Sequence, residues 1–145
     1  MKIYNGVIKL STFGNTDIID ITELVCEELN KSGIKDGFLL VFVPGATGAV
    51  TTIEYEEELV KDTKDLFKNL VGDTGPYRHN KTHTFGNASS HLRATLIGPS
   101  LVVPITNGRL DLGTWQQIVF IDFDNRPRDR KIIVKILGLT ENKNK

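Results

Sequence analysis

The chain has 145 residues, of which 39% are hydrophobic and 25% are charged, and these values fit one ordinary globular domain. Eighteen Lys and Arg residues balance eighteen Asp and Glu residues, so no overall field favours nucleic acid or an anionic membrane. The single cysteine, Cys26, excludes an internal disulfide framework and a multi-cysteine zinc module. We expect a soluble, cytoplasmic protein with no nucleic-acid or membrane partner, because the N-terminus lacks the apolar run of a signal peptide and no stretch approaches the roughly 18 apolar residues of a membrane span.

The N-terminal segment predicts two strands followed by a helix. Residues 2–10 partly alternate apolar and polar side chains, and the run 18–21 follows a Gly-Asn turn, so the pattern predicts a hairpin. The apolar spacing changes to a helical one after Asp20, and Gly33 stands just past the end of the periodic segment. Cys26 falls within this amphipathic helix as an ordinary packing residue.

The next segment predicts two strands and a second helix. Residues 37–44 form a continuous apolar run between Gly and Pro, which is typical of a central strand covered on both faces. The run 49–55 is rich in β-branched residues and predicts another strand. Acidic residues 56–58 suit a helix N-terminus, and apolar residues continue at helical spacing until Gly72.

The second half predicts a long polar loop and a meander of strands. The loop spans 72–90, and strand-like runs follow at 91–97, 101–105, 114–123 and 131–137. The pattern therefore predicts one α+β domain over residues 1–140, with largely antiparallel sheets that carry two helices on one side. Residues 141–145 predict a short polar tail. A parallel βαβ arrangement is the alternative fold.

Histidines cluster in and just after the polar loop. His79 and His83 lie within it, and His91 opens the segment that follows. Imidazole is the commonest side-chain metal ligand, and the separations allow the loop to fold back towards His91. The sequence has no HExxH or Cys/His motif, so the spacing leaves a metal site and hydrogen-bonded surface histidines equally open.

The same segment also favours anion binding. Arg78, Lys81 and Arg93 suit phosphate oxygens, and the Gly86–Asn87 pair lets backbone N–H groups approach an anion. These cations alternate with histidines rather than with acids, which favours a phosphorylated ligand over simple solvation of a loop.

Other polar residues have both a functional and a structural interpretation. Glu54 ends a strand and suits a base or a carboxylate that orients a histidine, although a plain surface acid fits its position better. Arg109 and Gln116 flank a hairpin turn and suit ligand contacts, with Trp115 between them as a packing anchor. The mixed charges of residues 122–130 predict a solvated edge or an intersubunit salt-bridge surface.

Three stretches resemble one known family. They read FVPGATGAVTTIEYE, YRHN and SHLRATLIGPSLVVPITNGRLDLGTWQQIVFIDFD. Together they cover most of the chain and resemble the YjbQ-like family, often labelled secondary thiamine-phosphate synthases. The resemblance implies a compact, β-sandwich-like α+β domain that assembles as a homotrimer, with the polar loop near a subunit boundary.

The family's activity would be a low-level transferase reaction. It joins hydroxymethylpyrimidine diphosphate to thiazole phosphate and releases pyrophosphate, a reaction helped by cations and a divalent metal, zinc or magnesium. The resemblance places the family's two recurrent histidines on His79 and His91, its strand-end acid on Glu54, and its signatures on Asn107, Gly108, Arg109, Thr114, Trp115 and Gln116. From the chemistry of the implied reaction, we expect the following roles: His79 and His91 as metal ligands; Glu54, His91 and Arg93 in catalysis; and Arg78, Lys81, Asn87, Arg109 and Gln116 in substrate binding.

The chain departs from the family pattern at two places. Phe85 precedes the Gly86–Asn87 pair where many relatives carry an acid, and Ser89 replaces a common histidine. If the missing acid or the missing histidine is a metal ligand in relatives, metal affinity here is weaker than in those relatives. The alternatives are a metal-dependent hydrolase and a non-catalytic binding protein for a phosphorylated small molecule.

Overall fold

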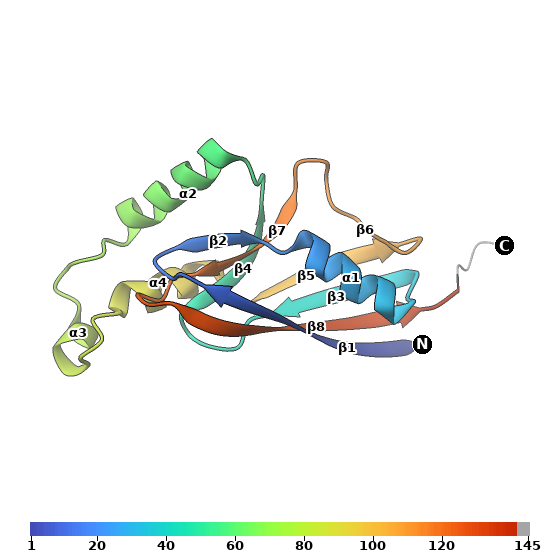
Figure 1. Cartoon of the computed structure of the whole chain (residues 1–145), viewed down its shortest axis with the longest axis horizontal. Helices are drawn as coiled ribbons and strands as arrows, with labels where there is room; N and C mark the ends of the chain where they lie inside the picture. Colours follow the sequence, from blue (N-terminus) through green and yellow to red (C-terminus); the bar gives the residue numbers. More distant parts are fainter. Residues whose placement is uncertain (142–145) are drawn as a thin grey trace.

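The computed structural model describes residues 1–141, so all but the first residue of the predicted tail at 141–145 lies outside that part (Figure 1). Twelve elements follow one another as β1(Lys2–Thr12), β2(Asp17–Asp20), α1(Thr22–Ser32), β3(Asp36–Phe42), β4(Gly48–Ile53), α2(Glu57–Leu70), α3(Arg78–Thr82), α4(Ala88–Ile97), β5(Ser100–Thr106), β6(Arg109–Leu110), β7(Gln117–Asp122) and β8(Arg128–Leu139). The predicted class, a single α+β domain with mostly antiparallel strands, is confirmed. None of the helices in the described part is long and apolar enough to cross a bilayer.

The strands form two antiparallel sheets. The larger sheet has the order β1-β8-β3-β5-β6, and the smaller has the order β2-β7-β4. The predicted hairpin at the N-terminus is wrong, because β1 pairs with β8 and β2 pairs with β7. The positive-φ residues Gly14, Asn15 and Thr16 carry the chain from one sheet to the other instead of closing a two-residue turn.

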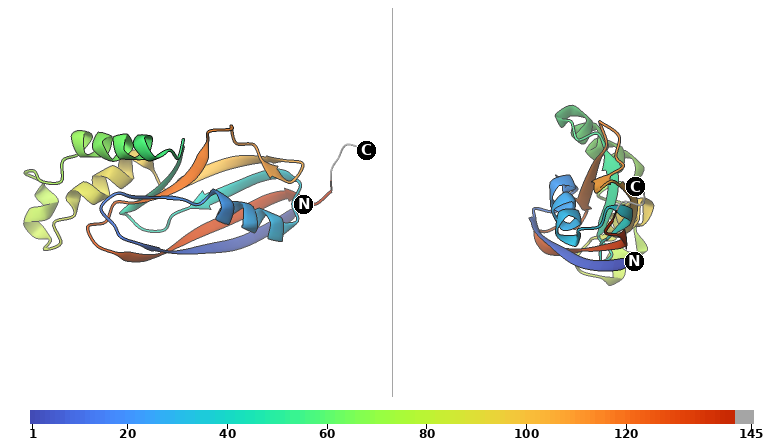
Figure 2. Two further views of the ribbon diagram at one scale, coloured as in Figure 1. Left: turned by 45° about the horizontal axis from the view of Figure 1, so that its top comes forward. Right: turned by 90° about the vertical axis from the view of Figure 1, so that its right-hand side faces the viewer.

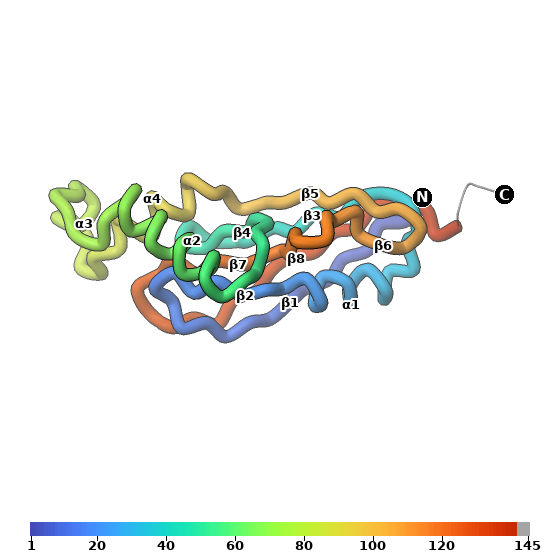
Figure 3. Tube along the Cα trace, turned by 90° about the horizontal axis from the view of Figure 1, so that it is seen from above, coloured from blue at the N-terminus to red at the C-terminus, as the bar shows by residue number. Residues whose placement is uncertain are grey.

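Two apolar cores lie on opposite faces of the small sheet. The first fills the space between the large sheet, α1 and one face of the small sheet, where Val25, Leu39 and Phe120 are fully buried. The second packs Phe67 of α2 and Ala94 of α4 against the other face. Helices therefore lie on both faces of the small sheet, with α2 and α4 together at one end of the molecule (Figures 2 and 3).

The polar segment 72–97 contains two helices that the sequence did not predict. Residues 91–97 form most of α4 rather than a strand, and α3 lies inside the expected loop. The buried residues Ser90, Arg93 and Ala94 recur at helical spacing, and small side chains let α4 approach β4 closely. The alternation of apolar and polar residues after His91 was therefore a misleading local signal.

The large sheet leaves one apolar face uncovered within a single chain. The register places Ile3, Leu137, Phe38 and Pro104 in one cross-strand row. Phe38 is 47% exposed and Ile3 is 64% exposed. The prediction that the strand at 37–44 is central is confirmed, but the prediction that both of its faces are covered is wrong for the isolated chain.

Candidate functional site

Helix α3 is anchored to the start of α4 by polar contacts. The Asn80 side-chain oxygen accepts a hydrogen bond from the Ala88 backbone N–H at 3.0 Å. The Tyr77 hydroxyl, at the start of α3, donates to the Gly72 carbonyl at 2.7 Å. These bonds satisfy one of the free N–H groups of α4 and fix the otherwise polar loop. By holding α3 against the start of α4, these bonds bring the histidines of the two helices together.

The three histidines form a cluster, which we call the histidine cluster. The rings of His79 and His83 stack with centroids 4.2 Å apart and planes 16° apart. The His91 ring meets that of His79 edge-on, with centroids 5.1 Å apart. The predicted approach of the loop histidines to His91 is therefore observed, and it is made by α3 folding against α4.

The orientation of His91 is fixed by the segment before β4. Its Nδ1 lies 3.0 Å from the Ala46 carbonyl oxygen. Because a carbonyl only accepts hydrogen bonds, Nδ1 carries the proton in this contact. The neutral ring then presents an unprotonated Nε2, which can accept a proton or bind a cation.

His91 separates two cavities of different character. The tyrosine cavity, of about 590 Å³, is bounded by Pro76, Tyr77, Arg78, His79, Ala88, His91 and Leu92. The arginine cavity, of about 220 Å³, includes His91, Asn87, Arg126, Arg128 and Arg130, with Asp124 as its acid. One cavity therefore offers apolar and aromatic surface, the other offers positive charge, and His91 reaches both.

Buried ion pairs support the arginine cavity. Arg130 donates two hydrogen bonds to Asp122, each 2.8 Å long, and Thr12 donates a third at 2.6 Å. Burial alone would raise the pKa of Asp122, but the hydrogen bonds from Arg130, Thr12 and the Asp124 backbone N–H lower that pKa below its usual value. Asp122 is thus ionised at neutral pH and holds Arg130 in place.

Next to this pair, Asp124 binds a second arginine. Its carboxylate accepts a hydrogen bond from Arg128 and lies 3.9 Å from Arg126. Asp122 and Asp124 are 0% and 3% exposed, respectively. The prediction of a solvated edge at residues 122–130 is therefore wrong for the two acids and Arg130.

Only some of the predicted ligand-binding residues meet at the histidine cluster. Arg78 and Asn87 each border one of the two cavities. Lys81 is exposed on α3 and borders neither cavity. Arg93 is two residues after His91, about 200° around the helix, and therefore lies on another face of α4. Its guanidinium donates to the Val71 carbonyl and to Asp73.

Glu54, Arg109 and Gln116 lie away from the histidines of the same chain. His91 contacts Ala46 before β4, whereas Glu54 follows the other end of this strand, about 20 Å away for a six-residue strand. Gln116 donates to Thr52 near that same end at 3.1 Å. Arg109 is exposed in β6, at the edge of the large sheet. A single chain therefore does not bring Glu54 to His79 and His91.

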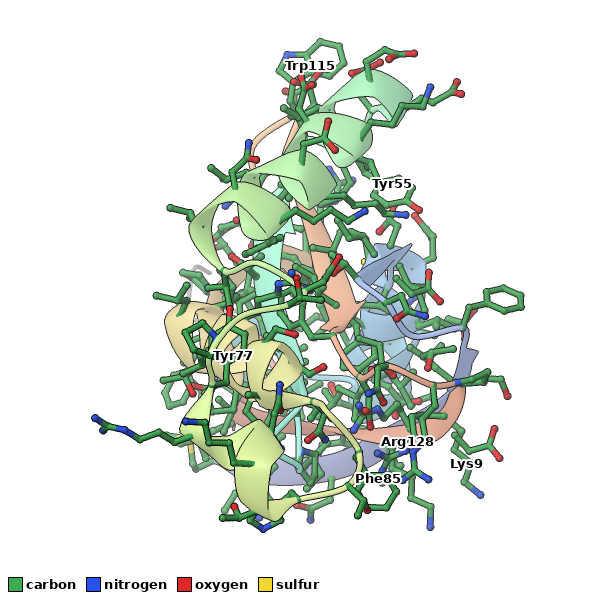
Figure 4. The ribbon with its side chains drawn as sticks, turned by 90° about the vertical axis from the view of Figure 1, so that its left-hand side faces the viewer. Lys9, Tyr55, Tyr77, Phe85, Trp115 and Arg128 are labelled. Atoms are coloured by element: carbon green, nitrogen blue, oxygen red, sulfur yellow. The ribbon has the colours of Figure 1, made fainter. Side chains whose placement is uncertain are left out.

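The expected packing role of Trp115 is also wrong for the single chain. Residues before Gln117 form a turn rather than the start of a strand, and Trp115 is 72% exposed. Figure 4 shows Trp115 near the start of α2, at the opposite end of that view from Phe85 and Arg128. We call Glu54, Trp115 and Gln116 the strand-end cluster.

The described residues do not form a complete metal site. No group of three or more His, Cys, Asp or Glu side chains within residues 1–141 is placed to hold an ion. The stacked rings of His79 and His83 do not direct their nitrogens to a common point. We therefore derive no chemical step through a metal, and the divalent ion stays a prediction.

The fold and the site define a small α+β protein with a histidine between a cationic and an apolar cavity. The family model described as UPF0047 protein YjbQ-like matches residues 6–139. The chain belongs to this YjbQ-like family. A UPF0047 protein of Methanothermobacter thermautotrophicus is 41% identical over 95% of this chain and 94% of its own length. The UPF0047 protein YugU of Bacillus subtilis is 35% identical over 90% and 97%.

Solved structures of relatives have the same fold. A YbjQ-like protein of unknown function from Sulfolobus solfataricus superposes with a TM-score of 0.90 at 36% identity, covering 94% of this chain and 98% of that one. A YjbQ/UPF0047 protein from Clostridium acetobutylicum gives a TM-score of 0.84 at 37% identity, covering 91% and 99%. The resemblance noted from the sequence is thus confirmed at the level of family and fold.

Proposed function

We propose that the chain is a small transferase of the secondary thiamine-phosphate synthase type that works at the histidine cluster. It would join hydroxymethylpyrimidine diphosphate to thiazole phosphate in the cytoplasm. The observation that carries this proposal is the position of His91 between an arginine-lined and an apolar cavity. A substrate with a heteroaromatic ring and a phosphate group needs both environments side by side.

Each cavity has a task in this reaction. The bond between the pyrimidine methylene carbon and the diphosphate oxygen breaks, pyrophosphate leaves with the electron pair, and the thiazole nitrogen bonds to the carbon. Arg126 and Arg128 stabilise the charge of the leaving diphosphate, because arginine binds phosphate oxygens in a planar fork. Tyr77 and Leu92 shield the cationic ring from water. His91 Nε2 hydrogen-bonds to the reacting groups.

We further propose that the working unit is a homotrimer whose subunits share the site. The uncovered row through Ile3 and Phe38 and the exposed Trp115 provide apolar surface for contacts between copies. Within one chain the strand-end cluster is too far away to act on the histidines. A neighbouring copy could place Glu54 and Gln116 beside them, which restores the predicted role of Glu54 in orienting a histidine. A solution mass of three chains by light scattering would support this assembly, and a monomer at micromolar concentration would refute it.

The test of the reaction compares His91→Ala with His83→Ala. Both remove an imidazole, but His83 is exposed and borders neither cavity. With both substrates and Mg²⁺, the unmodified protein should form thiamine phosphate above the uncatalysed rate. We expect His91→Ala to lose about 100-fold or more, as for a lost hydrogen bond at the reacting centre, and His83→Ala to stay within a few-fold.

Three outcomes would contradict parts of the proposal. Equal activity of His91→Ala and the parent would refute the assigned site. Release of phosphate from one substrate alone, with stoichiometric zinc lost on His79→Ala, would favour the metal-dependent hydrolase. A ligand-induced rise in melting temperature without turnover would favour a non-catalytic binding protein.

A further inference from the structure

A third cavity lies on the face of α4 that is turned away from His91. It has a volume of about 420 Å³, within the usual range for small-molecule sites. Its lining includes Ser89, Ser90 and Arg93 of α4, Thr16 of the turn before β2, and Lys68 of α2. We call it the hydroxyl cavity, because three buried hydroxyl groups meet there.

These three hydroxyls have no partners in the protein. Thr16, Ser89 and Ser90 are 3%, 7% and 2% exposed, and within residues 1–141 none of their side chains forms a hydrogen bond, whereas every other buried polar side chain does. No fully enclosed side-chain oxygen or nitrogen in this part of the chain lacks a partner. The three oxygens therefore keep access to the cavity. Hydroxyl groups that open onto a cavity and have no partner in the protein are free to bond to a polar occupant, so a cavity that collects three of them favours such an occupant.

The start of α4 adds backbone donors to the same place. Its N-cap residue, Asn87, makes no side-chain capping bond. Asn80 takes the Ala88 N–H, and His91 N bonds to the Asn87 carbonyl. The N–H groups of Ser89 and Ser90 have no partner among the described residues. Free N–H groups at the positive end of a ten-residue helix favour an anion.

The charges of the lining also favour an anion. Arg93 is nearly buried, and only its Nε and Nη2 atoms are used, in bonds to Val71 and Asp73. Asp73 is the acid of the lining, and its carboxylate lies 2.8 Å from the Arg93 guanidinium. Lys68 forms no ion pair within residues 1–141, so the lining keeps one positive charge beyond the Arg93–Asp73 pair.

Thr16 reaches the cavity through a strained backbone. Gly14, Asn15 and Thr16 have φ values of 75°, 54° and 63°. A β-branched residue in the left-handed region is unusual, and such strain is found where the backbone must present a group in a fixed position.

We infer that the hydroxyl cavity is a phosphate-binding site, for the free ion or for a small phosphomonoester, and that it is separate from the histidine cluster. A phosphate group accepts hydrogen bonds from all sides, and this cavity offers hydroxyl, backbone N–H and ammonium donors. The inference does not depend on the proposed transferase activity, since it uses other residues on another face of α4.

Calorimetric titration at constant ionic strength tests this inference, with inorganic phosphate in one arm and glycerol phosphate in the other. The Ser89→Ala/Ser90→Ala double variant should weaken binding by about ten-fold or more, as for hydrogen bonds to a charged group. Lys68→Met should weaken it by about five-fold. Lys64→Met, on the same helix but outside the three cavities, is the matched control. His91→Ala should leave this binding unchanged.

The ligand-free melting temperature separates binding from folding. Because Ser89 and Ser90 lose no protein hydrogen bond on truncation, the double variant should melt no lower than the parent without phosphate. Tighter binding of glycerol phosphate would assign the site to an ester, and tighter binding of inorganic phosphate would assign it to the free ion. Absence of millimolar binding in both arms, binding that the serine variant leaves intact, or equal losses in Lys64→Met would overturn the inference.

Discussion

Replacement of Arg130 by Met should strongly lower the free energy of unfolding, because it leaves Asp122 beneath the arginine cavity without its charged partner. The change removes three hydrogen bonds of 2.8 Å, two to Asp122 and one to Thr47. The remaining Asp122 carboxylate is 0% exposed and keeps only the donors Thr12 and the Asp124 N–H. Removing one partner of a buried pair costs about 3–5 kcal/mol, a large fraction of the roughly 5–15 kcal/mol that stabilises a domain.

The stability loss in Arg130→Met should depend on pH, because it depends on the charge of Asp122. In the parent, the lowered pKa of Asp122 adds stability above the pKa of an unfolded aspartate, and this stability is lost as the pH falls through the folded value. In Arg130→Met, burial without the guanidinium favours the neutral acid, so acid relieves the unpaired charge. The difference between the two proteins should therefore be largest near pH 7 and shrink below about pH 4.

Urea unfolding followed by circular dichroism measures this difference, because urea is uncharged and does not screen ion pairs. All variants are compared at one protein concentration. Arg126→Met is the control: its side chain is 57% exposed and 3.9 Å from Asp124, so we expect a change within about 0.5 kcal/mol. The Asp122→Asn/Arg130→Met double variant should lose less free energy of unfolding than the sum of the losses in the two single variants, since it leaves no unpaired charge. A loss below about 1 kcal/mol in Arg130→Met, or one independent of pH, would refute the reasoning.

Three further predictions concern packing and charge elsewhere. Phe67→Ala should lower the free energy of unfolding by about 3–5 kcal/mol, because Phe67 is 4% exposed and fills the core between α2 and the small sheet; Phe67→Leu should recover much of it in the same urea assay. Gly138→Ala should destabilise by about 1–3 kcal/mol, since its Cβ would lie 2.1 Å from the Asp36 carbonyl oxygen across the β3–β8 pairing; an unchanged urea midpoint would contradict this. Glu28→Gln should make the free energy of unfolding depend less on pH below neutrality. Hydrogen bonds from Lys31 and Tyr4 lower the pKa of Glu28, so its stabilisation is lost as the pH falls through that value. A pH dependence as steep as that of the parent would disprove this.

The candidate site was predictable in part because its chemistry is concentrated in one segment. His79, Asn87 and His91 lie within thirteen residues, so a folded loop was enough to bring them together. The arginine cavity was missed, since it pairs α4 with the start of β8 and the turn before it, and no local spacing links His91 to Arg128. Glu54 was placed correctly at a strand end, but a strand is straight and separates its two ends.

Helix α4 shows why local patterns mislead at a site. Residues 91–97 alternate well enough to predict a strand, yet the small residues Ala88, Ser89 and Ser90 allow a helix to pack closely on β4. The packing of a whole helix against the small sheet outweighs a weak local preference.

The sequence by itself determined several of the periodic elements and the family, because spacing, helix caps and characteristic residues are local properties. It set α1 with its Gly33 end and α2 with its acidic start. Only the tertiary structure decided which strands pair, as in the joining of β1 to β8 across more than a hundred residues. It also decided that Asp122 is buried with Arg130 and that three hydroxyls share one cavity, since these contacts depend on packing between segments far apart in the chain.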